Sequence, residues 1–495
     1  MDDTNESRRR TDRLRGRRGE GRGGRGGGGN ESRGTLVLSD REGYVGDTLV
    51  LKGRNFPPNE RFEIQWESVQ GRWGVLQAHE IVGPQFRPRT DTIATVEADA
   101  AGKFDEEWTI PEDYGGTHQL SVTDGDGQSI ADAEFEIRPW FELEQTTAEM
   151  GESFTLRGYG LGPDVMKNNY QVSWDNGYVG FVTGVQNRGT ATAEIRAVGP
   201  PGEHVVQVWR NYRGIPYLLN NTQSPFGEVA GERRNVWTVE VTEPEEPPRT
   251  AWMDPLLDEQ ALDTHLPEVA DDTEATLDIT PKSGQAGTDT VITGTGFPAN
   301  ETVDLTWYRH EGHEGRGTSS TPDPTITPRP KPDVLPRVTT DSDGRFEVEF
   351  EVPTDIGSTR PITAAVNGRE VAATGFMMQP SIERFEPRSG PVGTEIEIEL
   401  SGLGWTNYEN AAMFVYDNDP LGYACGTGGD DETGTLNPVL YAAGEPGWHF
   451  IDVYPSLFEV EEDDPDFELR PHLSYLDNHP VRPLPAMHFA FEITE

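Results

Sequence analysis

The sequence predicts an all-β protein built from four tandem β-sandwiches, arranged as a duplicated pair of modules behind an N-terminal tail. Many segments alternate apolar and polar residues with a period of two, as in TLVLKG (48–53) and EIEIEL (395–400). Turn dipeptides such as Asp126-Gly127 and Asn367-Gly368 separate these segments, and no long amphipathic helix interrupts them. Short alternating strands at regular spacing are typical of β-sandwiches.

The third observation is an internal repeat, which defines the modules. MGESFTLRGYGLG (150–162) aligns without gaps on VGTEIEIELSGLG (392–404), and AVGPPGEHVVQVW (197–209) matches AAGEPGWHFIDVY (442–454). We call this unit module B, with copies B1 (140–243) and B2 (381–495). Because both ends of the unit match, the whole module is duplicated rather than one motif.

A second unit, module A, precedes each copy of module B. VGDTLVLKGRNFPPNERFEIQW (45–66) aligns on AGTDTVITGTGFPANETVDLTW (286–307), which places A1 at 35–139 and A2 at 275–380. Residues 244–274 between the two A–B cassettes are acidic and proline-rich, which is typical of an extended linker. The sequence therefore predicts the cassettes but does not set the angle between them.

Residues 1–34 form an arginine- and glycine-rich tail that we expect to be disordered, because it has almost no apolar area to bury. The tail has no apolar run of the kind found in a signal peptide. Two interpretations remain open, a solvated tether and a basic arm that contacts a polyanion.

The remainder of the chain is strongly acidic. The formal net charge is −45, although ten arginines lie in the tail. Such a body should repel nucleic acid and anionic membranes, and no apolar run approaches the ~20 residues of a membrane span. Excess acid with few lysines resembles proteins of salt-loving microbes, and an ordinary acidic secreted protein is the alternative. The single cysteine, Cys425, excludes an intrachain disulfide.

One short motif occurs in both B modules, as WDNGYVGF (174–181) and YDNDPLGY (416–423). We expect its first aromatic residue to end a core strand and its Asp-Asn pair to lie in a turn. Asp419-Pro420 replaces Gly177-Tyr178 in the second copy, so we expect the chemistry of the turn to change. A ligand site at Asp175, Asn176, Asp417 and Asn418 is the alternative.

An aromatic residue recurs at one equivalent strand position in all four modules, where we expect it to anchor the core. These residues are Trp66, Trp174, Trp307 and Tyr416.

The second cassette resembles a known family at the start of each module. ITPKSGQAGTDTVITGTGF (279–297) and FEPRSGPVGTEIEIELSGLGW (385–405) share a P-x-S-G-x-x-G-T start, an alternating strand and a G-x-G-F/W end, and in this they resemble IPT/TIG domains. The resemblance implies immunoglobulin-like sandwiches that serve as binding or spacing modules. A fold of this kind does not determine a function.

Motifs for catalysis are absent, which predicts a non-enzymatic protein: the sequence has no G-x-S-x-G, HExxH or P-loop. His310 and His313 lie in a Gly-, Thr- and Pro-rich segment (308–336), expected to be a loop in which they form a surface pair, with a metal site as the alternative. Asp124-Gly-Asp-Gly127 and Asp341-Ser-Asp-Gly344 resemble calcium loops but lack EF-hand spacing, so turns are expected there. No cofactor is predicted, and weak calcium binding by the acidic surface stays open.

Both B modules carry an oversized loop before their last strand, and long loops on a rigid scaffold often carry function. Aromatic residues and arginines in these loops suit the recognition of a protein or glycan. Alternatively, each loop folds over its own sheet or the neighbouring A module. The candidate binding residues are Arg210, Tyr212, Arg213, Tyr217, Phe226, Phe467 and Tyr475.

Together these features predict a non-enzymatic structural or adhesive protein, extracellular or at the cell surface, whose modules space and present the B-module loops to a protein or glycan. One alternative is a virion structural or host-attachment protein of a virus that infects a halophilic host. Another is an accessory binding module of a glycan-active system. The acidic body is not expected to bind nucleic acid, and no membrane insertion is expected.

Overall fold

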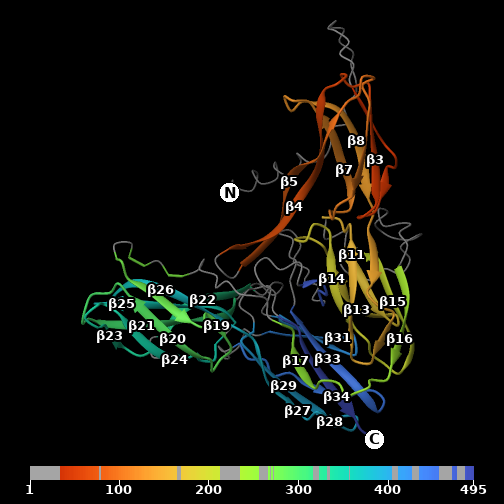
Figure 1. The fold of residues 1–495 in the computed structure, drawn as a ribbon. Helices are drawn as coiled ribbons and strands as arrows, with labels where there is room; N and C mark the ends of the chain where they lie inside the picture. The colour runs from red at the N-terminus through yellow and green to blue at the C-terminus, as the bar shows by residue number, and fades with distance from the viewer. Residues whose placement is uncertain are drawn as a thin grey trace, which may run out of the picture.

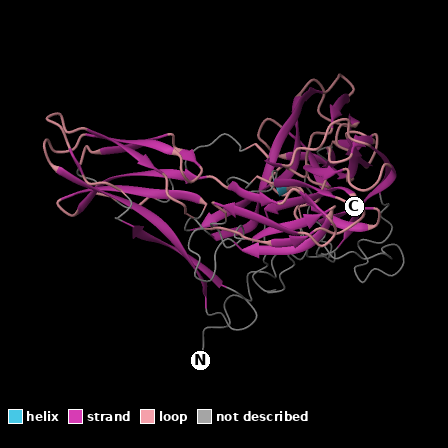
Figure 2. Cartoon of the chain, turned by 90° about the horizontal axis from the view of Figure 1, so that it is seen from below, coloured by secondary structure: helices cyan, strands magenta, loops and turns pink. Residues whose placement is uncertain are grey.

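The structure, a computed structural model, describes residues 34–76, 80–163, 169–211, 235–255, 266–267, 269–270, 273–315, 323–331, 335–355, 357–403, 411–425, 434–455, 471–475 and 485–495. The elements of these residues are the strands β1 to β34, and Figure 2 shows strands and loops over nearly all of the chain drawn in colour. None of the described residues belongs to a helix long and apolar enough to span a membrane. The prediction of an all-β fold with tandem immunoglobulin-like sandwiches is confirmed.

Module A1 is a sandwich of a three-stranded and a five-stranded sheet. Its sheets have the orders β1-β3-β6 and β2-β8-β7-β4-β5. The first strand lies in the small sheet, and the chain then crosses to the large sheet, where β2 pairs in parallel with the last strand, β8. The strands are β1 (Thr35–Leu38), β2 (Glu42–Gly43), β3 (Thr48–Arg54), β4 (Arg61–Leu76), β5 (Glu80–Glu97), β6 (Phe104–Thr109), β7 (Gly116–Thr123) and β8 (Ser129–Ile137).

Module B1 repeats this topology. Its sheets have the orders β14-β11-β9 and β10-β16-β15-β12-β13, and β10 again pairs in parallel with the last strand. The strands are β9 (Trp140–Leu143), β10 (Thr147–Glu149), β11 (Ser153–Tyr159), β12 (Asn169–Trp174), β13 (Gly177–Val182), β14 (Ala191–Arg196), β15 (Gly202–Asn211) and β16 (Asn235–Thr242).

Module A2 has the orders β18-β20-β24 and β19-β26-β25-β21-β22, with β23 paired to β21. Its strands are β18 (Thr276–Thr280), β19 (Ser283–Gly284), β20 (Asp289–Thr295), β21 (Thr302–Gly315), β22 (Asp323–Lys331), β23 (Val338–Thr339), β24 (Phe346–Glu351), β25 (Ser358–Val366) and β26 (Arg369–Met378).

Module B2 gains a strand from outside its own sequence. Its small sheet has the order β27-β29-β32, and its large sheet the order β17-β34-β33-β30-β31, with β28 also on β34. The added strand is β17 (Ala251–Met253), which lies in the segment predicted as a linker and pairs antiparallel with β34. The other strands are β27 (Ser381–Glu386), β28 (Ser389–Gly390), β29 (Glu395–Ser401), β30 (Ala411–Tyr416), β31 (Asp419–Cys425), β32 (Val439–Tyr441), β33 (Gly447–Pro455) and β34 (Met487–Ile493).

The expected aromatic anchors lie in the cores. Trp66, Trp174 and Trp307 are buried, and Tyr416 is half-buried at the end of β30. In the two A modules this aromatic residue also makes a buried hydrogen bond: the indole N–H groups of Trp66 and Trp307 each donate at 2.8 Å to a buried carboxylate. A buried indole N–H needs such an acceptor. The acceptors are Asp113 and Asp355.

The repeated Asp-Asn motif forms the same turn in both B modules. Asp175 and Asn176 have φ of 48° and 68°, and Asp417 and Asn418 have φ of 47° and 69°. Two successive residues with positive φ between paired strand ends define the two-residue hairpin turn that favours Asn and Asp. The expected change of turn chemistry was wrong, because the exchanged residues lie after the turn and already belong to β13 and β31.

Both A modules contain a long hairpin that was not predicted from the sequence. In A1 it is formed by β4 and β5, and in A2 by β21 and β22, whose ladder extends from Trp307–Lys331 to Gly315–Asp323. His310 and His313 therefore lie on a strand and not in a loop as expected, although their side chains lie outside the described ones. The segment is rich in glycine, threonine and proline, a composition that favours the prediction of a loop over that of a strand.

Each A module is joined to the following B module by a close backbone contact at an equivalent glycine, and in the first cassette hydrogen bonds accompany it. Tyr114 donates to Val185 O at 2.5 Å, and the Gly115 amide donates to Leu161 O at 3.0 Å. A Cβ at Gly115 would overlap the Gly160 carbonyl oxygen, and one at Gly357 would overlap the Gly402 carbonyl oxygen at the equivalent place in the second cassette. Only glycine allows this approach of backbones, so the junction recurs with the duplication.

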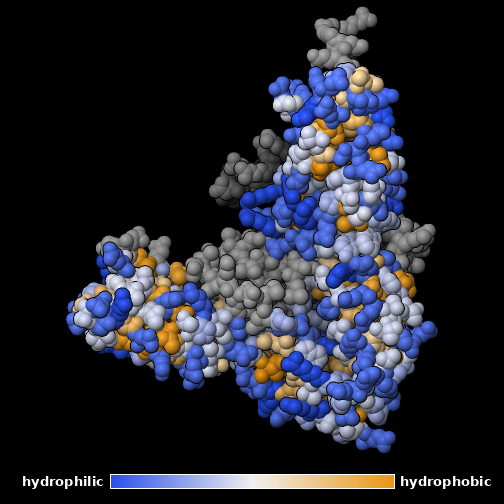
Figure 3. Space-filling view, viewed as in Figure 1, coloured by the Kyte–Doolittle hydropathy of each residue, from blue (hydrophilic) through white to orange (hydrophobic). Residues whose placement is uncertain are grey.

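The four modules form an angled shape with a two-module centre (Figure 1). B1 and B2 lie side by side, A1 continues from the end of B1, and A2 extends away from B2 in another direction. The face seen in Figure 3 is mostly hydrophilic, in keeping with the acidic composition. The contact between B1 and B2 therefore determines where the two arms point.

Candidate functional site: the interface between the two B modules

The large sheet of B2 is buried on both of its faces. Along β33, Ile451 and Val453 enter the core of B2 itself, whereas Phe450 and Tyr454 point to the opposite face. That opposite face belongs to the core of B1, because one continuous apolar cluster joins the B1 core to residues of B2. The B2 members of the shared cluster are Met413, Val415, Phe450, Tyr454, Leu473, Tyr475, Ala486 and Ala490.

A buried ion pair lies in this interface. Arg196, at the end of β14 in B1, and Asp452, in the middle of β33 in B2, each expose 2% of their side chains. The guanidinium Nε lies 3.1 and 3.0 Å from the two carboxylate oxygens, and its NH2 group lies 2.6 Å from Oδ1. Two-pronged contact of this kind is the strong geometry for an arginine and a carboxylate.

The other donors of Arg196 are also engaged. NH1 donates to Gly151 O at 2.7 Å, and the guanidinium carbon lies 5.0 Å from the ring of Trp252 and 5.7 Å from that of Phe450. Trp252 comes from β17, so the segment that was predicted as a linker helps to enclose the ion pair. Burial opposes the charge of Arg196, and the field of Asp452 overcomes this, so the pKa of Arg196 is raised.

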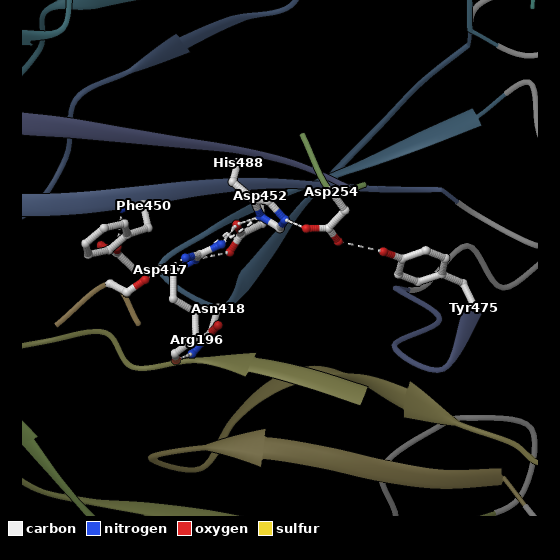
Figure 4. A network of polar contacts seen from close by, with 9 residues as sticks. Arg196, Asp254, Asp417, Asn418, Phe450, Asp452, Tyr475 and His488 are labelled. Atoms are coloured by element: carbon white, nitrogen blue, oxygen red, sulfur yellow. Dashed lines mark hydrogen bonds and ion pairs between the residues drawn. The ribbon is translucent and has the colours of Figure 1, made fainter. Parts of the chain in front are cut away.

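The ion pair continues into a chain of polar groups, drawn in Figure 4. His488, on β34, places Nδ1 2.6 Å from Asp452 Oδ1 and Nε2 3.1 Å from Asp254 Oδ1. Tyr475 donates to the other oxygen of Asp254 at 3.2 Å. Burial favours neutral His488, but its hydrogen bonds to Asp254 and Asp452 outweigh this, so its pKa is raised.

The cluster combines two carboxylates with an arginine and a histidine. When His488 is protonated, it and Arg196 carry two positive charges opposite the carboxylates of Asp254 and Asp452. Burial disfavours the charge of Asp452, but Arg196 and His488 hold the pKa of this carboxyl well below its usual range. A buried pair is costly to break because removal of one partner leaves an uncompensated charge. We therefore expect that loss of either Arg196 or Asp452 weakens the contact between B1 and B2.

Main-chain hydrogen bonds join the modules at a second place. The amide of Phe181, on the edge strand β13, donates to Pro471 O at 3.0 Å, and the amide of Leu473 donates to Phe181 O at 2.8 Å. The ring of His472 stacks on Phe181 at 4.7 Å. Burial lowers the pKa of His472 to about 3, so this ring is neutral. Residues 471–475 of B2 thus run along the sheet edge of B1.

The hairpin turn of B2 completes the contact. Asn418, the second residue of the turn, donates from its side chain to Arg196 O at 2.9 Å. Gly151 of B1 lies so close to Phe450 that an added Cβ would come within 2.5 Å of the ring. The turn that the sequence singled out therefore has a structural role in both copies and a docking role in the second.

Most predicted binding residues lie outside the described residues: Tyr212, Arg213, Tyr217, Phe226 and Phe467. Arg210 is half-buried on β15, where its backbone is paired with Tyr170. Tyr475 is 7% exposed and belongs to the interface, so it contacts B1 and the linker instead of facing a partner. Tyr475 therefore packs against module B1, whereas the alternative expected a long loop to fold over its own sheet or the neighbouring A module.

Two histidines and the acidic turn residues have structural roles. His204 and His449 each place Nδ1 beside the turn aspartate of their module, at 2.6 and 2.5 Å. Asp124 and Asp341 each accept two backbone amides of their own turn, which is turn chemistry as expected. Among the described residues no group of three His, Cys, Asp or Glu side chains is arranged to hold a metal ion.

The residues that join B1 to B2 were missed, although one signal was present. Asp452 and His488 replace Gln207 and Val236 of B1 at equivalent strand positions. Each lies on a strand face whose neighbours, such as Phe450 and Ala490, are apolar. An ionisable residue within a two-sided apolar strand indicates a buried partner.

Comparisons with known proteins give no family. No family model matches the chain, and no curated protein matches it. Among solved structures it is similar to native α-2-macroglobulin of Escherichia coli, with 9% identity over 92% of this chain and 31% of that one, at a TM-score of 0.18. It is also similar to an α-2-macroglobulin mutant of Salmonella, with 8% identity over 94% of this chain and 31% of that chain, at 0.18.

A third similar structure is a putative membrane-anchored protein of Corynebacterium diphtheriae, with 9% identity over 70% of this chain and 91% of that one, at a TM-score of 0.17. The chain spans about a third of the length of the macroglobulins. Likeness at this level carries no argument about activity or about the arrangement of modules. The resemblance to IPT/TIG domains stays a prediction.

Proposed function

We propose that this chain is a non-enzymatic structural or adhesive protein of a cell surface or extracellular assembly. In this proposal the docked B1–B2 pair is a rigid centre that holds A1 and A2 as two arms. The supporting observation is the buried Arg196–Asp452 pair, which fixes one module on the other. The repeated glycine contact between each A module and its B module extends that rigidity into the arms.

The composition agrees with such a scaffold. An acidic surface keeps extended multi-module proteins soluble and apart from one another. The B1 loop (212–234) keeps its predicted role as a partner contact. In B2, residues 471–475 serve the scaffold instead.

The test is the distance between the arms. Cys425→Ser removes the native thiol, and Asp126→Cys in A1 with Ser342→Cys in A2 supply two exposed label sites. Pulsed electron–electron spectroscopy of the doubly spin-labelled chain should give one narrow distance distribution. A broad distribution would mean flexibly linked cassettes and would contradict the rigid scaffold.

Location is tested separately. Fractionation of the source cells should recover the chain at the envelope or in the medium. Recovery only in dense particles that contain nucleic acid would instead support the virion alternative. Confinement to the cytosol would contradict both.

A further inference from the structure

The two B modules present the same sandwich edge in different states. The first two strands of each module follow each other in sequence and lie at one edge of the sandwich. The opposite edge is formed by the strand at the other end of each sheet. In B1 this edge consists of β13 and β14, and in B2 of β31 and β32. We call it the far edge.

The far edge of B1 is covered by B2. On β13, Phe181 exchanges main-chain hydrogen bonds with Pro471 and Leu473, and the bridge between Phe181 and His472 is parallel. On β14, Arg196 binds Asp452. Both strands of this edge therefore have a protein partner within the chain.

The far edge of B2 is apolar, and no described segment pairs with the main chain on the outer side of β31. Strand register makes Tyr423 the counterpart of Phe181 and Tyr441 the counterpart of Arg196. Four large apolar side chains are exposed there. They are Leu421 (52%), Tyr423 (54%), Val439 (46%) and Tyr441 (61%).

A glycine lies at the equivalent position on each far edge, and the two glycines differ in what surrounds them. At Gly180 in B1 an added Cβ would come within 2.5 Å of Pro471 O and 2.8 Å of the Leu473 side chain, so the covering segment needs this glycine. Its counterpart Gly422, with a φ of 154° that itself favours glycine, has no atom within 4 Å of the same point. The space next to Gly180 that residues 471–475 fill on B1 therefore has no atom in it next to Gly422 on B2.

The A modules protect their corresponding edges, as natural sheet proteins do. Strand β5 carries Arg89 and Asp91, and β22 contains three prolines in its nine residues. From Pro420 to Cys425, β31 carries no charged residue. The first residue of β31, Asp419, lies against Gly177 of β13 in B1. Among the large-sheet far edges that the structure describes, β31 alone is neither charged beyond this residue, nor rich in proline, nor paired through its main chain on its outer side.

We propose that the far edge of B2 binds an extended, apolar and aromatic segment of a partner protein, which adds to β31 as a parallel strand. This inference rests on the proposed function, for which it supplies the contact surface. The segment 471–475 on B1 shows the chemistry: backbone groups pair with the edge, an aromatic ring stacks at the position of Phe181 and Tyr423, and an aliphatic side chain lies over the glycine.

A second copy of this chain is the less suitable occupant. Its own segment 471–475 is already engaged on B1, and two bodies of net charge −45 repel each other. A partner segment without acidic residues avoids that repulsion.

The probe is a synthetic peptide, RPHLSYL, which reproduces residues 470–476 of this chain. Titrated into the full-length protein and followed by calorimetry or fluorescence anisotropy, it should bind in a saturable manner, and a scrambled peptide should not. Tyr423→Lys, which adds a charge to the exposed edge and removes the stacking ring, should weaken binding about tenfold.

The matched control is Val392→Lys, which also replaces an exposed apolar side chain (61%) but lies at the opposite edge, between β28 and β29. It should leave binding unchanged. The proposal is overturned if the peptide does not bind, or if Tyr423→Lys and Val392→Lys bind equally well, because the peptide would then occupy another surface. A wild-type dimer in sedimentation that Tyr423→Lys dissociates would overturn it in favour of edge-to-edge self-association.

These outcomes are separable from those of the scaffold proposal. Flexible arms with intact, Tyr423-dependent binding would contradict the scaffold alone. Rigid arms without binding would contradict the edge site alone.

Discussion

Asp452→Asn is the sharpest test of the interface between B1 and B2. The substitution keeps the shape of the side chain but removes the negative charge that faces Arg196. Arg196 is 2% exposed and would keep Gly151 O, the His488 ring at 2.7 Å and two aromatic rings around it, but no carboxylate at ion-pair distance among the described residues. An uncompensated buried charge costs about 3–5 kcal/mol, so we expect B1 and B2 to open more easily by that amount.

The measurement is hydrogen exchange, because unfolding of a four-module chain is not a two-state process. Amides of β14 and β33 should exchange roughly a hundred- to a thousandfold faster or more, at about tenfold per 1.4 kcal/mol. The strands of A2 serve as an internal reference. Replacement of both partners, by Arg196→Met with Asp452→Leu, should restore much of the protection, because neither charge is then left unpaired.

The matched control is Asp105→Asn, which removes the exposed partner of Arg54 from a pair of 3.1 Å. With side chains 35% and 61% exposed, such a pair is worth less than about 1 kcal/mol. If Asp452→Asn loosens β33 no more than Asp105→Asn loosens β6, the ion pair does not hold the modules together.

Three further predictions concern other contacts. The pKa of His472 is about 3 in the fold and about 6.5 in an unfolded chain, so acid favours unfolding below pH 6.5. Native-state hydrogen exchange of β13, corrected for the intrinsic effect of pH on exchange, should show a loss of about 2 kcal/mol between pH 6.5 and 4.5 beyond the loss in His472→Gln; an equal loss in both would contradict the assignment. Gly151→Ala, at φ 90° and against Phe450, should cost about 2 kcal/mol or more, seen as faster exchange in β33, and normal protection would refute it. Asp113→Ala should destabilise A1 by about 1–3 kcal/mol, because the buried Trp66 N–H loses its acceptor, and this should appear as a lower melting temperature. Asp126→Ala, on an exposed turn, should leave the melting temperature unchanged.

The sandwiches could be predicted because their information is local. Period-two alternation, the turn at Asp417-Asn418 and the recurrent position of Trp66 and Trp307 each depend on neighbours in sequence. The long hairpin of A2 was missed because Pro324, Pro328 and Pro330 oppose a strand assignment, although on an edge strand proline is tolerated.

The interface could not be predicted in the same way, because its members are far apart in sequence. Arg196 and Asp452 come from different modules, and Asp254 and Trp252 come from a segment with linker composition. Composition predicted an extended chain for this segment. It could not predict that three of its residues would add to the sheet of a module that begins more than a hundred residues later.

The duplication explains which contacts recur and which do not. The contact between an A module and its own B module lies within the duplicated unit, so Gly115 and Gly357 perform the same role twice. The contact between B1 and B2 joins two copies through different surfaces, the far edge of one and the sheet face of the other. Such a contact always leaves one edge and one face without the partner that the other copy has. The residues differ accordingly, with Arg196 at the covered edge of B1, Asp452 on the docking face of B2, and Tyr441 at the B2 position equivalent to Arg196. A head-to-tail contact that ends after one step leaves the far edge of B2 without that partner, and the tyrosines and valine exposed there are not the charged residues that usually protect a sheet edge.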